Sequence, residues 1–96
     1  MDNVTRESLR LCLLRLLNDA PGRTANESVL HASVQSFGFA VSRDQLVTEL
    51  SWLKEQGALD VGTIADLKIA TGNLRTDDIV NDRAQVPGIQ RPRPKA

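Results

Sequence analysis

Residues 41–59, VSRDQLVTELSWLKEQGAL, are typical of an amphipathic helix with a defined start and a defined end. Ser42, followed three residues later by Gln45, has the form of a capping box, in which the two side chains satisfy free N–H groups at a helix start. Gly57 favours the left-handed conformation that ends many helices. Three leucines share one narrow stripe, at about 100° per residue: Leu46, Leu50 and Leu53. The recognition helix of a helix-turn-helix domain is often built in this way.

The outward side of this helix carries few cations. It holds six residues that point broadly away from the leucine stripe: Asp44, Gln45, Thr48, Ser51, Trp52 and Glu55. Trp52 is unusual on an outer face. It is predicted either to be covered by another segment of the chain or to anchor a contact with a protein, because Trp is enriched at the energetic centres of interfaces.

A first helix is expected from about residue 3 to residue 17. Its apolar residues recur at the spacing of one buried helix face: Leu9, Cys12, Leu13, Leu16 and Leu17. Leu11 and Leu14 lie well off that face. They are predicted to pack beneath a neighbouring segment, to be scattered leucines of the surface, or to form the self-association face of a homodimer. Pro21 and Gly22 then favour a turn.

A second helix is expected to begin near Thr24 or Asn26. Thr24 with Glu27 has the form of a capping box, and Asn26 is an equally good cap. Its apolar stripe is predicted to contain Leu30, Val34 and Phe37, before a stop at Gly38. Together with the other two helices it would supply a core that we predict to contain seven residues: Leu13, Leu16, Leu30, Val34, Leu46, Leu50 and Leu53.

The periodicity changes after Gly57. The segments ALDV (58–61) and LKIAT (67–71) are typical of short strands, and GTIAD (62–66) would turn between them, so a β-hairpin is the simplest interpretation. Residues 72–84, GNLRTDDIVNDRA, have weak helical character. The chain ends in VPGIQRPRPKA, whose prolines favour a turn and then an extended segment.

Charge is unevenly distributed along the 96 residues, although the net charge is zero. Residues 1–84 hold nine Lys and Arg against twelve Asp and Glu, a balance of −3. Residues 85–96 hold three cations and no acid. We therefore expect a mildly acidic domain over residues 1–84 and a basic, proline-rich C-terminal tail over residues 85–96.

Three helices followed by a two-stranded wing is the plan of the winged helix-turn-helix, a mainly α fold with a small β-hairpin. The junction LSWLKEQGALDV (50–61) resembles the passage from recognition helix to wing. Three longer segments resemble a family of small winged-helix proteins of Mu-like bacteriophages and prophages: LCLLRLLNDAPG (11–22), the segment 26–59, and VPGIQRPRP (86–94). The resemblance implies this fold, with a short C-terminal helical segment and an extended tail, and a phage origin. It implies no particular activity.

A winged helix of this kind is expected to bind double-stranded DNA, as a small phage regulator of transcription or an accessory protein. The start of the third helix would face base edges with Arg43, Asp44, Gln45 and Thr48, while Ser42 contacts a phosphate. Lys68 would contact DNA from the wing. Three cations of the tail would form an arm along the backbone or in the minor groove: Arg91, Arg93 and Lys95.

The shortage of cations favours an alternative, because affinity for DNA comes largely from neutralising phosphates. A winged helix could instead serve as a protein-interaction module without reading DNA. Trp52 and the acidic outer face would then bind a phage or host protein. The two interpretations differ in the residue that matters most, Arg43 in one and Trp52 in the other.

Other classes of function have little support in the sequence. There is no glycine-rich phosphate loop and no recognisable catalytic motif, so we do not expect an enzyme. Cys12 and His31 are the only cysteine and histidine. An intrachain disulfide and clustered Cys/His zinc sites are therefore excluded, and no cofactor or metal is expected. No apolar run approaches the length of a membrane span, so we expect a protein of the host cytoplasm.

Overall fold

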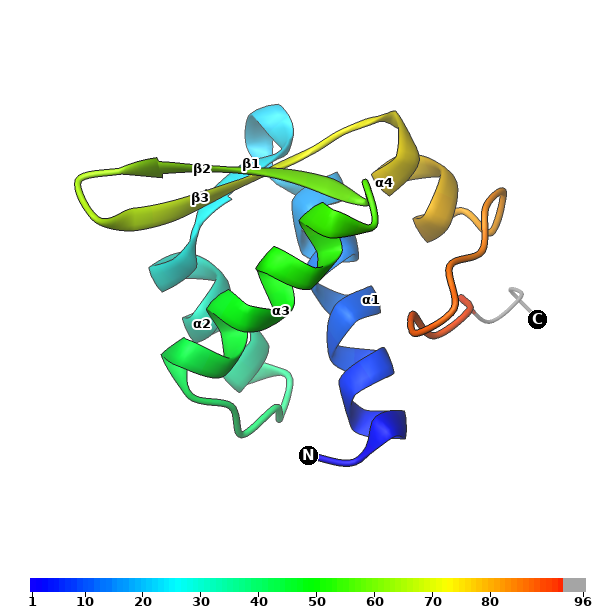
Figure 1. Ribbon diagram of the computed structural model, residues 1–96, viewed down its shortest axis with the longest axis horizontal. Coiled ribbons are helices and arrows are strands. Elements are labelled where there is room, and N and C mark those ends of the chain that lie inside the picture. Colours follow the sequence, from blue (N-terminus) through cyan, green and yellow to red (C-terminus); the bar gives the residue numbers. More distant parts are fainter. Residues whose placement is uncertain (93–96) are drawn as a thin grey trace.

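Four α-helices and a three-stranded antiparallel sheet form the mixed α/β architecture of the computed structural model, which describes residues 1–92 (Figure 1). The helices are α1 (Asn3–Asp19), α2 (Glu27–Ser36), α3 (Arg43–Glu55) and α4 (Leu74–Val80), and the strands are β1 (Thr24–Asn26), β2 (Leu59–Ile64) and β3 (Leu67–Gly72). A 3-10 turn, Pro21–Arg23, joins α1 to β1. The expected three helices and hairpin are present, and α4 lies in the segment that was expected to have weak helical character. Only the third strand, β1, is additional.

The starts of α2 and α3 are fixed by side-chain caps. Asn26, rather than Thr24, caps α2, and its side chain accepts a hydrogen bond from the Val29 N–H at 2.9 Å. The capping box of α3 is confirmed. Ser42 Oγ accepts from the Gln45 N–H at 3.1 Å, and Gln45 Oε1 accepts from the Ser42 N–H at 3.0 Å.

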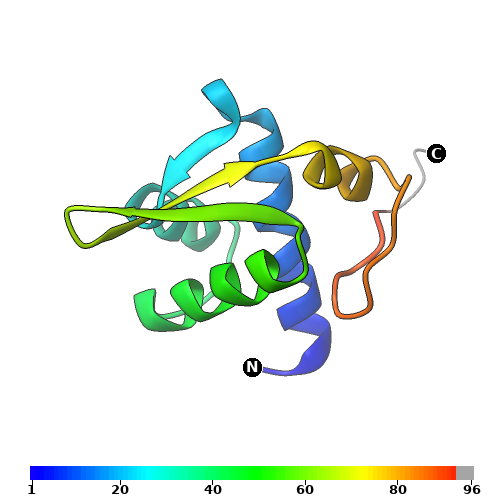
Figure 2. The same cartoon turned by 45° about the horizontal axis from the view of Figure 1, so that its top comes forward.

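The sheet has the strand order β1-β3-β2, with β3 in the centre. Ala65 and Asp66, both with positive φ, form the two-residue turn between β2 and β3. The predicted connection over residues 62–66 is therefore too long, because Gly62 to Ile64 pair with β3. β1 pairs with β3 on the other side, where Thr24 lies opposite Thr71. Figures 1 and 2 show the hairpin extending beyond the helices that it covers.

The core lies between the sheet and the helices. Six of the seven predicted core residues are buried, whereas Leu16 is half-buried at its edge. Phe37, expected on the buried stripe of α2, is 65% exposed because α2 ends at Ser36 and Phe37 forms its C-cap.

The prediction that Leu11 and Leu14 form a self-association face is wrong, because the chain itself covers them. They are 2% and 0% exposed. On the same side of α1, Asn18 donates to Asp77 of α4 at 3.2 Å, and the Glu7 carbonyl accepts from the Gln90 N–H at 3.3 Å. α4 and the segment after it thus cover this face of α1.

The expected domain boundary after residue 84 comes too early. Val86 and Ile89 are each 6% exposed and belong to the hydrophobic core. Residues 85–92 therefore pack on the domain, whereas the predicted tail beyond them, residues 93–96, lies outside the described residues. Among residues 1–92, no helix is both long enough and apolar enough to cross a membrane.

Replacing Leu50 by Ala tests the assigned core face of α3. Leu50 is 1% exposed, so Leu50→Ala should lower the free energy of unfolding by about 2–5 kcal/mol. Leu74→Ala is the matched control, because Leu74 is 82% exposed and should change stability by less than about 0.5 kcal/mol. Urea denaturation measures both; equal effects of the two substitutions would contradict the assignment.

Candidate nucleic-acid interface

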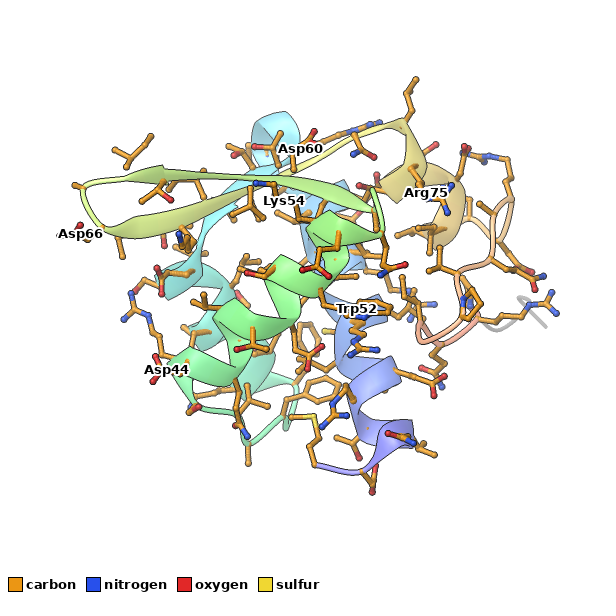
Figure 3. All side chains as sticks on the ribbon, in the orientation of Figure 1. Asp44, Trp52, Lys54, Asp60, Asp66 and Arg75 are labelled. Atoms are coloured by element: carbon orange, nitrogen blue, oxygen red, sulfur yellow. The ribbon has the colours of Figure 1, made fainter. Side chains whose placement is uncertain are left out.

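The start of α3 presents five predicted DNA-contacting residues at the surface. All five are exposed: Ser42, Arg43, Asp44, Gln45 and Thr48. Figure 3 shows Asp44 at this end of α3 and Asp66 at the tip of the neighbouring hairpin. Two of the side chains cap the helix, and the Thr48 hydroxyl donates to the Asp44 carbonyl at 3.0 Å. Arg43 is the only cation in this group.

Glu27 joins the start of α3 to the sheet. It is the first residue of α2 and only 7% exposed. Its Oε1 accepts from the Lys68 backbone N–H at 2.8 Å, and its Oε2 faces Arg43 Nε at 3.3 Å. One carboxylate therefore contacts both α3 and β3 from α2. The sequence pattern pointed only to a capping role for Glu27, because its partners come from segments distant along the chain.

The guanidinium of Arg43 has both bonded and free nitrogen atoms. Its Nε is used by Glu27, whereas its Nη groups make no hydrogen bond to another residue of the described chain. The Arg43 side chain is 45% exposed. A guanidinium presents five N–H donors in a fixed plane. The carboxylate of Glu27 therefore restricts the orientation of Arg43 and leaves its outer donors facing solvent.

The hairpin supplies little further positive charge. Lys68 is its one cation, and the Lys68 Nζ donates to Thr63 Oγ1 at 3.1 Å. Asp60 and Asp66 lie on the same hairpin and are exposed. Glu27 thus links the Lys68 backbone to Arg43, while the Lys68 ammonium is directed to Thr63 on the hairpin itself.

Arg91 does not join this face. Its guanidinium pairs with Asp82, with Nη2 to Oδ2 at 2.9 Å, and this pairing lowers the pKa of Asp82 and raises the pKa of Arg91. The segment after α4 lies across the molecule from the start of α3 in Figures 1 and 2. The other two predicted arm residues, Arg93 and Lys95, lie outside the described residues.

Trp52 packs against other parts of its own chain. The Arg10 guanidinium lies over the indole, 3.7 Å from the ring centroid. Arg10 also donates from Nε to Glu49 Oε1 at 2.6 Å and from Nη1 to the Gly88 carbonyl at 2.9 Å. Trp52 is thus half-buried between α1 and the segment after α4. It is not the free contact anchor that the protein-interaction hypothesis required.

Comparison with known proteins places the chain among phage proteins. It is 35% identical, over all its 96 residues and 99% of the relative, to the "uncharacterized protein gp26" of Escherichia phage Mu. The chain belongs to the family of phage Mu gp26. This confirms the predicted relationship to Mu-like phages.

A second relative is an "uncharacterized protein" of Haemophilus influenzae, 44% identical over 57 residues, which are 59% of this chain and 55% of that protein. No protein-family model and no solved structure match the chain.

Gly88 is expected to be essential for the packing around Trp52. Its φ is +97°, and a Cβ at this position would lie 2.8 Å from the Trp52 ring. Gly88→Ala should therefore lower the free energy of unfolding by about 2–4 kcal/mol, through backbone strain and overpacking together. It should also shift Trp52 fluorescence to longer wavelength as the ring gains contact with water.

Gly38→Ala separates the effect of backbone strain from that of overpacking. Gly38 has a similar φ of +93°, but a Cβ there would meet nothing within 4 Å. It should lower the free energy of unfolding by about 1–2 kcal/mol and leave the fluorescence unchanged. The described packing would be contradicted if both variants had the same stability and the same spectrum.

Proposed function

We propose that the protein is a winged helix that binds double-stranded DNA through the start of α3 and the β2–β3 hairpin. The proposal is supported by the order α1-β1-α2-α3-β2-β3 and by a hairpin that stands beside an exposed helix start. In such a domain α2 and α3 form the helix-turn-helix, and the hairpin is the wing. The N-terminal residues of α3 would then meet base edges in the major groove.

The observation that carries the proposal is the restricted orientation of Arg43 beside Glu27. A guanine presents two acceptors in the major groove, and an arginine can bind both at once. Glu27 uses only the Nε of Arg43 and leaves the outer donors available. Holding the side chain in place before binding reduces the entropy lost on binding. Arg43 is therefore the residue to which we assign most of the sequence selectivity.

The distribution of charge sets the expected strength of binding. Of the ten Lys and Arg in residues 1–92, five are in ion pairs: Arg6, Arg10, Arg43, Arg83 and Arg91. Few cations remain to neutralise phosphates, and α3 exposes Asp44 and Glu55 as well. We therefore infer modest affinity with a shallow salt dependence. This suits a phage regulator or accessory protein that acts in the host cytoplasm.

A protein-interaction module is the second candidate, and the hairpin tip favours it. Ile64 is 67% exposed next to the acidic turn residue Asp66, where a DNA-binding wing commonly carries cations. A phage or host protein with a basic rim around an apolar pocket would match this tip. If the protein binds no DNA, a protein-interaction module becomes the favoured function.

Three variants test the DNA proposal against duplexes selected from a random pool, by fluorescence anisotropy at several salt concentrations. Arg43→Ala should weaken binding to the preferred sequence by about 1–3 kcal/mol. Arg75→Ala is the matched control: it removes the same charge from an exposed arginine at the start of α4 and should not change sequence preference. Glu27→Gln keeps an acceptor for the Lys68 amide but removes the charge that orients Arg43.

Glu27→Gln distinguishes positioning from simple charge. It makes the protein more positive, so electrostatics alone predicts tighter binding to every sequence. The proposal predicts instead that the ratio of preferred to random binding falls. Equal losses in Arg43→Ala and Arg75→Ala would overturn the role of Arg43. If the wild-type protein shows no salt-sensitive binding to any duplex, the DNA function itself fails.

A further inference from the structure

An open groove runs along the side of α1 that faces away from α3. Its volume is about 650 Å³, and nine residues line it: Ser8, Cys12, Arg15, Leu16, Asp19, Ala20, Phe37, Phe39 and Gln90. Phe37 is 65% exposed at its rim, while Leu16 and Phe39 are half-buried within it. The groove is thus partly apolar and has a large aromatic side chain open to solvent.

The groove is separate from the proposed DNA-binding face. Arg10 marks the side of α1 that contacts α3, through Glu49. At 100° per residue, Cys12, Arg15 and Asp19 lie roughly 140–200° around the helix from Arg10. Anything bound in the groove would therefore leave α3 and the hairpin free.

The rim of the groove carries one positively charged and one negatively charged residue. Arg15 and Asp19 are both exposed, and within residues 1–92 neither forms an ion pair with another residue. They are four residues apart on one helix, so they project from the same side. A partner that offers a carboxylate to Arg15 and a cation to Asp19, about one helical turn away, would therefore be complementary to this rim. A second copy of this surface does so when its α1 runs in the opposite direction.

We infer that this groove is the interface of a symmetric homodimer in which the two α1 helices lie antiparallel. A two-fold axis makes each contact occur twice. With the axis near the level of Leu17, Arg15 faces Asp19 of the partner subunit, and the converse pair forms on the other side. The exposed Phe37 and the half-buried Leu16 supply the apolar surface that the second copy would cover. This inference does not depend on the DNA function.

Charge reversal across the interface tests the inference by sedimentation velocity over a wide range of protein concentration. The wild-type protein should dimerise as its concentration rises. Arg15→Asp and Asp19→Arg should each raise the dimer Kd by about tenfold, because two ion pairs become two repulsive contacts. The double variant restores opposite charges and should dimerise nearly as well as the wild type. Arg75→Asp changes the charge equally at a distant site and should have no specific effect.

Cys12 provides a second readout that does not depend on mass. Burial raises the pKa of its thiol, and the side chain lines the groove. Alkylation of Cys12 at fixed pH should slow as wild-type concentration rises, and it should not slow in Arg15→Asp. A monomer at every concentration would overturn the inference. So would a dimer that both single reversals leave intact, since its interface would then lie elsewhere.

Discussion

The buried carboxylate of Glu27 is the contact on which the proposed binding face depends. Burying a charge is unfavourable unless it is paired and hydrogen-bonded. Here the Lys68 amide and the Arg43 guanidinium supply the hydrogen bonds, and the position at the first residue of α2 places the charge near the positive end of the helix dipole. The same two contacts bring the hairpin to the start of α3. Loss of Glu27 would therefore affect the position of the hairpin and the orientation of Arg43 together.

A second buried carboxylate, Glu49, joins α3 to α1. It is 7% exposed, pairs with Arg10 at 2.6 Å, and faces Arg6 at 3.5 Å. Arg10 in turn covers Trp52 and binds the Gly88 carbonyl. Some of the charged side chains on the helices are thus paired with one another. Because these cations are paired, the surface is poor in free cations. A few oriented contacts must therefore account for any recognition of DNA.

Local signals in the sequence predicted the local parts of the fold. The capping box of Ser42 and Gln45, the leucine stripe of α3 and the two strands of the hairpin each depend on neighbours within a few residues. β1 was not predicted, because its three residues become a strand only by pairing with β3, some 45 residues later. The burial of Leu11 and Leu14 was not assigned for the same reason, since the segments that cover them follow residue 73.

The candidate site shows the same contrast between features set by neighbouring residues and features set by distant segments. Exposure of Arg43 and Gln45 at a helix start was predictable from the cap. The role of Glu27 was not, because it requires α2, α3 and β3 to be assembled first. The position of Trp52 on an outer face is unusual in the sequence. Its partners are not predictable from neighbouring residues, because Arg10 and Gly88 lie far from it along the chain.

The proposed function requires DNA to contact the surface organised around Glu27. A titration of the isotopically labelled protein with duplex DNA, followed through its backbone amide resonances, locates the surface that DNA contacts. Residues 42–48 and 63–68 should show the largest shifts, and the amide of Lys68 should be among them, because it donates to Glu27. Shifts confined to the α1 groove or to the segment after α4, or no shift of any resonance at low salt, would contradict DNA binding at this surface.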